Sequence, residues 1–113
     1  MQFYHGSNKG YLHYFPWDGE SDEMDMLFAS ADASVAQRYG KNVFSVKLDL
    51  PLESVPRISV RDWMLGEEIP KGTFIIEAEE GNDDFPVETL VMRYTLDATI
   101  DPKPIHSAEE ASA

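Results

Sequence analysis

Residues 27–40, with the sequence LFASADASVAQRYG, constrain the fold more than any other stretch of this chain. The apolar run at the start of the stretch suits a buried strand. Ser30 or Asp32 can then cap a helix, because either side chain can accept a hydrogen bond from a free backbone N–H of the first turn. Apolar residues and then Tyr39 follow at helical spacing, and Gly40 stands where glycine commonly ends a helix. The stretch therefore predicts a strand, a turn and a helix in direct succession.

Further strands are indicated by β-forming residues, by alternation and by flanking turn residues. In the segment NVFSVKLDL, every second residue from Phe44 to Leu50 is apolar, as expected of a half-buried strand. The last two predicted strands are long enough to pair as a hairpin around an acidic turn at residues 79–85. The predicted strands lie at residues 2–4, 27–29, 42–50, 73–78 and 87–96. Strands with few helices predict an α+β fold with a mainly antiparallel sheet.

One more helix and several loops complete this prediction. Residues 59–64 favour a short helix that is capped by Ser59, ends before Gly66 and turns Val60, Trp63 and Met64 inward. The aromatic stretch 10–17 is interpreted as core, a lid or a binding platform, and the acidic stretch 18–25 as an exposed loop. Residues 51–58 are expected to be irregular, and residues 97–102 to turn away from the sheet. We expect a single domain at residues 1–102 and a disordered tail at residues 103–113.

The charge balance restricts the kind of partner. The chain has 113 residues, with 21 acidic and 9 basic side chains and a net charge of −12. Nucleic-acid binders usually carry a basic stripe, but the positive charges here are scattered. We therefore expect no direct nucleic-acid binding, and expect a protein partner with a basic surface.

Cysteine is absent, which excludes disulfides and thiolate chemistry. With no signal peptide and no run long enough to span a membrane, the sequence predicts a cytoplasmic protein. His13 and His106 lack partners at ligand spacing, and the acidic stretch lacks the pattern of a calcium loop. No metal site is expected.

Three polar motifs stand at the ends of predicted strands. The first strand runs into His5-Gly6-Ser7, the second ends at Ser30 with Tyr39 one helix later, and Glu88 directly precedes the last strand. Over residues 2–100, this ordered set resembles the His-Tyr-Glu branch of the ADP-ribosyltransferase superfamily, in a small bacterial or phage-type form. The resemblance implies an ADP-ribosyltransferase-like fold, which is a split, mainly antiparallel β-sheet with a few short helices.

The same resemblance implies that NAD is the substrate and gives the motifs their roles. His5 would hydrogen-bond a ribose hydroxyl, and Gly6 would hold the nicotinamide carboxamide through its backbone. Tyr39 would stack on the nicotinamide ring. Glu88 would bond the 2-hydroxyl of the nicotinamide ribose and stabilise the cation that forms as neutral nicotinamide leaves. The implied catalytic residues are Glu88, His5 and Tyr39, and the implied NAD-binding residues are His5, Gly6, Ser7, Ser30 and Tyr39.

Structural interpretations of these residues stay open beside the functional ones. His5 would otherwise be a histidine at a strand end, Tyr39 a core tyrosine, and Ser30 a helix cap. Glu77 and Asp84 compete with Glu88 for the acidic role. Members of the family that modify arginine carry Gln or Glu two residues before the catalytic Glu. This chain has Pro86 there, so arginine is not implied as the acceptor.

Two functions follow from the sequence. The first is a mono-ADP-ribosyltransferase that cleaves the nicotinamide–ribose bond of NAD and transfers ADP-ribose to a protein, as an effector of a phage or mobile element such as an anti-defence protein. The alternative is a non-catalytic acidic protein on the same fold, which like a DNA mimic inhibits a basic, nucleic-acid-binding partner. The second function follows from the charge of −12.

Overall fold

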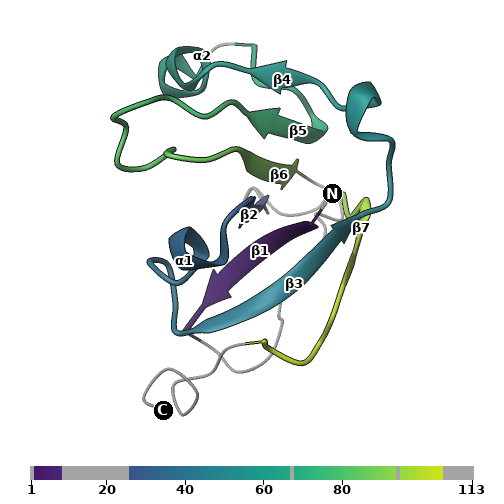
Figure 1. Cartoon of the computed structure of the whole chain (residues 1–113). Helices are drawn as coiled ribbons and strands as arrows, with labels where there is room; N and C mark the ends of the chain where they lie inside the picture. Colours follow the sequence, from purple (N-terminus) through teal and green to yellow (C-terminus); the bar gives the residue numbers. More distant parts are fainter. Residues whose placement is uncertain (1, 9–25, 67, 94, 106–113) are drawn as a thin grey trace, which may run out of the picture.

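The structure is a computed structural model and describes residues 2–8, 26–66, 68–93 and 95–105 of the chain (Figure 1). The predictions for the aromatic stretch 10–17 and the acidic stretch 18–25 lie outside the described residues. So does most of the predicted tail at residues 103–113. Of the described tail, Ile105 donates its backbone N–H to the carbonyl oxygen of Val43 (2.7 Å), so residue 105 lies beside the third strand.

The described residues form one mixed sheet with three short helical segments (Figure 1). The strands are β1 (Gln2–Ser7), β2 (Met26–Ser30), β3 (Asn42–Leu48), β4 (Arg57–Ile58), β5 (Gly72–Ile76), β6 (Thr89–Arg93) and β7 (Ala98–Ile100). The helical segments are α1 (Ala33–Ala36), the 3-10 turn η1 (Leu52–Ser54) and α2 (Val60–Leu65). The spatial order of the strands is β4-β5-β6-β2-β1-β3-β7, and β4–β5 is the one parallel pair among them. The predicted α+β class with a mainly antiparallel sheet and few short helices is therefore confirmed.

The sheet consists of two halves that meet at a narrow junction. Within the halves, strands pair along their length, as β1 does with β3 from Gln2 to Ser7. Between β1 and β2, in contrast, Tyr4↔Ser30 is the one residue pair. The halves are therefore β4-β5-β6-β2 and β1-β3-β7, and the backbone of the two strands separates beyond this pair.

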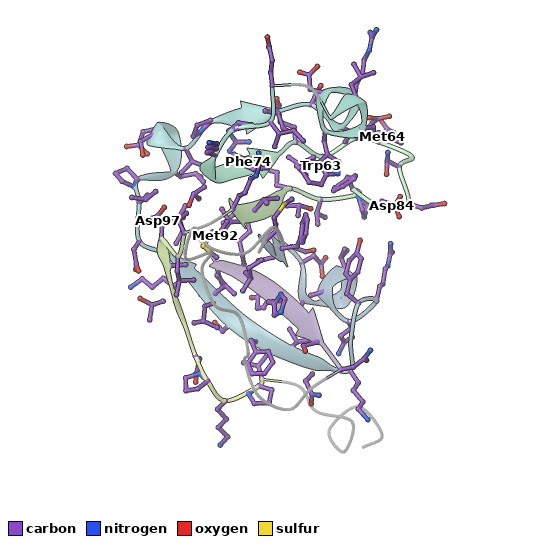
Figure 2. The ribbon with its side chains drawn as sticks, turned by 180° about the vertical axis from the view of Figure 1, so that it is seen from behind. Trp63, Met64, Phe74, Asp84, Met92 and Asp97 are labelled. Atoms are coloured by element: carbon purple, nitrogen blue, oxygen red, sulfur yellow. The ribbon has the colours of Figure 1, made fainter. Side chains whose placement is uncertain are left out.

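Each face of the sheet buries its own apolar cluster, because side chains alternate between the faces along a strand. The first face carries the larger cluster, with fully buried members on five strands: Phe3, Leu27, Val46, Ile75, Leu90 and Met92. The second face carries Val60 of α2 with Phe74, Ile76 and Val91. Trp63 of α2 packs against this second cluster, with its ring 6.0 Å from that of Phe74 (Figure 2) and edge-on to that of Phe28 at 5.8 Å.

Helix α2 follows the sequence prediction at both ends. The Ser59 hydroxyl accepts the backbone N–H of Asp62 at 3.1 Å, and Gly66 ends the helix in the left-handed conformation with φ 70°. Val60 is buried and Trp63 half-buried, as predicted. The inward placement of Met64 is wrong, because this residue is 75% exposed while its neighbour Trp63 packs against the sheet. No helix among the described residues is long and apolar enough to cross a bilayer.

Helix α1 is shorter than its sequence pattern predicts. It begins after Asp32, whose carboxylate accepts the N–H and the hydroxyl of Ser34 at 2.8 and 2.7 Å, so Asp32 rather than Ser30 is the cap. The helix ends at Ala36, and a turn carries the chain to Gly40. Tyr39 therefore lies outside the helix and is 59% exposed, which overturns its interpretation as a core tyrosine.

Two strands were not foreseen. Residues 51–58 contain η1 and the two-residue strand β4, and residues 98–100 form β7 against β3 rather than turning away. Strand β3 ends at Leu48, so the predicted inward position of Leu50 is wrong and its side chain is 39% exposed. Segments of two or three residues are too short to show a period of two, which explains why the sequence did not reveal β4 and β7.

Candidate functional site

The sheet places the three strands of the polar motifs side by side. Strand β2 lies between β1 and β6, so the strand ends that carry His5 and Glu88 flank it. Phe3 and Leu90 belong to the cluster of the first face. His5 lies two residues after Phe3, and Glu88 lies two residues before Leu90. Because side chains alternate along a strand, His5 and Glu88 project from the same face.

His5 is held at the junction of the two halves. Its Nδ1–H donates to the carbonyl oxygen of Phe28 on β2 at 2.7 Å, and its ring centroid lies 6.4 Å from that of Phe44. A carbonyl oxygen can only accept, so this bond requires hydrogen on Nδ1 and fixes the ring orientation. The bond spans the place where β1 and β2 have already separated. His5 thus marks the boundary between the halves and is half-buried there.

Glu88 is anchored through its backbone and paired through its side chain. Its carbonyl oxygen accepts the N–H of Ala31 at 2.9 Å, which fixes it beside the end of β2. Its Oε2 is buried and lies 3.0 Å from Nη1 of Arg57, an ion pair whose side chains are 31% and 37% exposed. The contact lacks hydrogen-bond geometry, so this oxygen has no hydrogen-bond partner among the described residues. The guanidinium of Arg57 compensates the charge of this oxygen, while its capacity to accept a hydrogen bond stays unused among the described residues.

The two competing carboxylates differ from Glu88 in their surroundings. Glu77 and Asp84 are both exposed, whereas Glu88 is half-buried with one oxygen shielded from solvent. Arg57, which the sequence analysis did not single out, pairs with Ile75 in the sheet and so points to the same face as Glu88. The sequence did not predict this placement, because β4 has only two residues and follows Pro56. The described site thus holds one arginine more than the motifs implied.

Ser30 does not share this face. It pairs with Tyr4 on one side and with Thr89 on the other, and these neighbours alternate with His5 and Glu88 along their strands. Its side chain therefore points to the second face, and only 5% of the residue is exposed. The register separates Ser30 from the two residues that it was predicted to accompany. Ser7 returns to the face of His5 and is half-buried.

Gly6 has a structural reason to be glycine. A Cβ at this position would stand 1.8 Å from the carbonyl oxygen of Ala36 at the end of α1. Gly40 meets the same strand end, where its Cβ would lie 2.2 Å from the backbone carbon of Ser7. The two glycines let α1 and the turn after it approach β1 closely. Packing alone thus accounts for Gly6, and its role in holding a carboxamide stays a prediction.

The turn that carries Tyr39 contacts the loop that leads to Glu88. The Tyr39 hydroxyl donates to the carbonyl oxygen of Asp84 at 3.4 Å, and Nη1 of Arg38 donates to that of Asp83 at 3.0 Å. The Asn82 side chain accepts backbone N–H groups of the same loop at 2.9 Å. Tyr39 thus contacts the loop that precedes Glu88. Gly6 and His5 are neighbours in β1 and point to opposite faces, so the close contact of Gly6 with Ala36 puts the end of α1 on the face opposite to His5.

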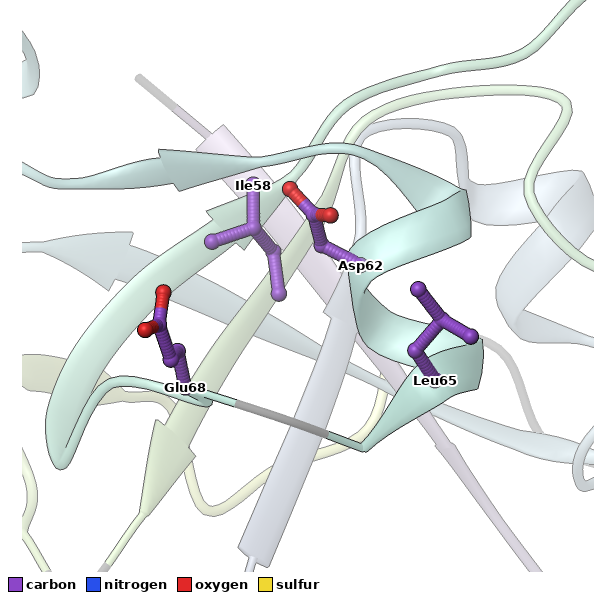
Figure 3. Close-up of a pocket in the computed structure, with 4 residues that line it drawn as sticks. All are labelled: Ile58, Asp62, Leu65 and Glu68. Atoms are coloured by element: carbon purple, nitrogen blue, oxygen red, sulfur yellow. The ribbon is translucent and has the colours of Figure 1, made fainter.

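A separate hollow lies on the other face of the sheet. It has a volume of about 320 Å³ and is lined by Ile58, Asp62, Leu65 and Glu68 (Figure 3). Ile58 follows Arg57 in β4, so the hollow and the ion pair lie on opposite faces. Glu68 adopts φ 52°, an uncommon conformation for a residue with a side chain. Within the described ranges, no group of three or more His, Asp or Glu side chains gathers as a metal site.

Comparisons with known proteins leave the chain without an assigned family. No family model matches it, and no curated protein or solved structure is significantly similar to it.

Proposed function

We propose that this protein is an NAD-dependent mono-ADP-ribosyltransferase with Glu88 as its catalytic carboxylate. One observation supports it most directly: β1 and β6 flank β2, and His5 in β1 and Glu88 directly before β6 project from one face, where a buried oxygen of Glu88 is ion-paired with Arg57. The sequence motifs alone do not require either placement. On this proposal the protein has the ADP-ribosyltransferase-like fold, with the division between the two halves of the sheet as its split.

The reaction assigned to this site breaks the bond between the nicotinamide nitrogen and the ribose C1 carbon. The bonding electrons leave with nicotinamide, which departs neutral, and positive charge develops on the ribose. Glu88 lowers the energy of that state through its negative charge and accepts a hydrogen bond from the 2-hydroxyl. A nucleophilic atom of the acceptor protein then bonds to C1 and loses its proton. His5 orients the ribose by hydrogen bonding.

The exposure of Tyr39 supports a stacking role for its ring. Tyr39 is 59% exposed, and an aromatic ring can stack on a planar nicotinamide. The proposed acceptor is a protein with a basic surface, in accordance with the charge of −12. The proposed setting is the cytoplasm, as an effector of a phage or mobile element.

Nicotinamide release and labelling of an acceptor by tagged NAD test the proposal. Glu88→Gln keeps the shape of the side chain and removes its charge, and we expect at least a roughly hundredfold loss of rate. Glu80→Gln is the matched control, because Glu80 is exposed in the preceding loop and its substitution changes the net charge equally. The proposal fails if the wild-type protein does not consume NAD, or if both variants keep the wild-type rate.

A second candidate function is non-catalytic binding to a basic partner. The hollow in Figure 3 favours it, because Asp62 and Glu68 stand beside the apolar Ile58 and Leu65, a lining suited to the stem and head of a lysine or arginine. Such binding should weaken steeply with salt and with Asp62→Asn or Glu68→Gln. It should persist in His5→Ala and Tyr39→Ala, whereas these two variants should impair a transferase.

A further inference from the structure

The ion pair between Arg57 and Glu88 occupies the atom that the proposed reaction needs. Nη1 of Arg57 lies 3.0 Å from the buried Oε2 of Glu88. A guanidinium stays charged at all physiological pH values, and at this distance it offsets the charge of the carboxylate. Stabilising a cation depends on that negative charge. The pair must therefore loosen before Glu88 can act.

Arg57 is placed so that it can change partners. It belongs to the two-residue strand β4 at the edge of the sheet, and its side chain is 37% exposed. The pair with Glu88 is the one polar interaction of its side chain among the described residues, and it lacks hydrogen-bond geometry. A partly exposed ion pair of this kind is weak. A ligand with a better anion can displace the carboxylate.

We propose that Arg57 exchanges Glu88 for a phosphate oxygen of a bound ribose phosphate. The guanidinium fork matches phosphate geometry and can donate two parallel hydrogen bonds to it. The displaced carboxylate then accepts a hydrogen bond from a ribose hydroxyl of the same ligand, which gives Oε2 the donor it lacks. A ligand that joins an anion to neighbouring hydroxyl groups satisfies both residues, and ribose phosphates have this chemistry.

This inference rests on the proposed function for the task of Glu88, but the binding that it describes needs no turnover. On a chain of charge −12, a phosphate ligand meets general repulsion, so a local cation matters more than on a neutral protein. In NAD, the phosphate that Arg57 binds belongs to the diphosphate. The binding of substrate and the release of Glu88 are then one event, which couples occupancy of the site to its activation.

The test is equilibrium binding to the full-length, isotope-labelled protein, followed by amide chemical shifts. The probes are ADP-ribose, ribose 5-phosphate and nicotinamide riboside, the last of which has no phosphate. We expect Arg57→Gln to weaken ADP-ribose binding at least about tenfold, the loss of one charge-assisted hydrogen bond or more. Arg57→Lys should weaken it less, and neither should change binding of the riboside. Arg61→Gln, an exposed arginine on α2, is the matched charge control and should change affinity less than about twofold.

Glu88→Gln distinguishes an Arg57 that exchanges Glu88 for phosphate from an Arg57–Glu88 ion pair that only stabilises the fold. Removal of the competing charge frees Arg57, while the amide oxygen still accepts a hydrogen bond. This variant should therefore bind ADP-ribose at least as tightly as the wild type, opposite in direction to Arg57→Gln. Ribose 5-phosphate binding that depends on Arg57 assigns a single phosphate as sufficient. Dependence for ADP-ribose alone assigns the diphosphate.

Three results overturn the inference: Arg57→Gln that binds like Arg61→Gln, equal weakening by Arg57→Gln and Glu88→Gln, or no shift of the wild-type spectrum with either phosphate ligand. The dispersion of each spectrum reports whether the variant is folded. If Arg57→Gln does not fold, the weaker loss expected for Arg57→Lys is measured in its place. A protein that consumes NAD without Arg57-dependent binding contradicts only this inference. A protein that shows such binding without NAD consumption contradicts only the transferase.

Discussion

Alanine at Gly6 is the perturbation whose consequence follows most directly from the structure. The added Cβ would lie 1.8 Å from the carbonyl oxygen and 2.8 Å from the carbonyl carbon of Ala36. Cβ contacts shorter than 3.0 Å are essentially never found in proteins, so the end of α1 would have to retreat by about 1.2 Å or more. The nearest atoms belong to the backbone, so no rotamer change can relieve the clash.

The expected cost is at the high end for overpacking. Extra methyl groups in packed interiors cost about 1–3 kcal/mol, and more when the backbone must move. We expect about 3 kcal/mol for Gly6→Ala. For a chain of this length, roughly 4 °C is lost per kcal/mol, so Tm should fall by about 12 °C.

Thermal and urea unfolding, followed by circular dichroism, measure this effect. Gly66→Ala is the matched control, because Gly66 has φ 70° but no atom within 4 Å of the added Cβ. It should cost only about 1 kcal/mol, from the left-handed conformation. If Gly6→Ala is as stable as the wild type, the close approach of α1 to β1 is wrong, and Gly6 is glycine for a different reason.

Substitutions at four further positions test the helices and the exposed tyrosine. Trp63→Ala should lower the free energy of unfolding by about 2–4 kcal/mol, because it removes the ring between Phe28 and Phe74. Met64→Ala should change the free energy of unfolding by less than about 0.5 kcal/mol. The midpoints of urea unfolding measure both effects. Hydrogen bonds from Ser34 hold the pKa of the Asp32 carboxyl below its usual 3.8, so its stabilising effect is present above that pH and is lost as pH falls through the lowered value. Asp32→Ala should therefore flatten the dependence of Tm on pH below about 4. If Tm falls with pH as steeply in this variant as in the wild type, Asp32 does not stabilise α1 as its cap. Tyr39→Ala should raise KM for NAD about threefold to tenfold with little change in Tm. Tyr39→Phe should act like the wild type, because the hydrogen bond of the hydroxyl group is long at 3.4 Å. If KM is equal in the wild type and both variants, Tyr39 does not stack on the nicotinamide.

The prediction was most accurate where a single segment carries its own signal. Ser59 and Gly66 bracket α2 because a cap and a left-handed stop act within a few residues. The alternation in residues 42–50 likewise located β3, and the hairpin of β5 and β6 followed from two long apolar runs around a turn. In α1, the same kind of signal fixed the start but overestimated the length, since the turn at 37–39 is set by the contact of Gly40 with β1.

The candidate site was predictable in its residue types and not in its arrangement. The motifs named His5 and Glu88, and the sheet places both on one face. They also named Ser30, which the register turns to the other face through its pair with Tyr4. Arg57 escaped prediction, because nothing near it in the sequence shows that β4 will run beside β5.

Features that depend on neighbours along the chain can be derived from the amino-acid sequence: the cap and stop of α2, the apolar faces of the longer strands, and the charge of −12. Features that depend on neighbours across the sheet are visible only in the folded protein. They are the single pair between β1 and β2, the close packing that requires Gly6, and the contact between Arg57 and Glu88. The difference lies in how far apart in the sequence the interacting residues are. Local hydrogen bonds and side-chain periodicity act within a few residues, whereas strand register and ion pairing join residues far apart in the chain, for which a single sequence carries no signal.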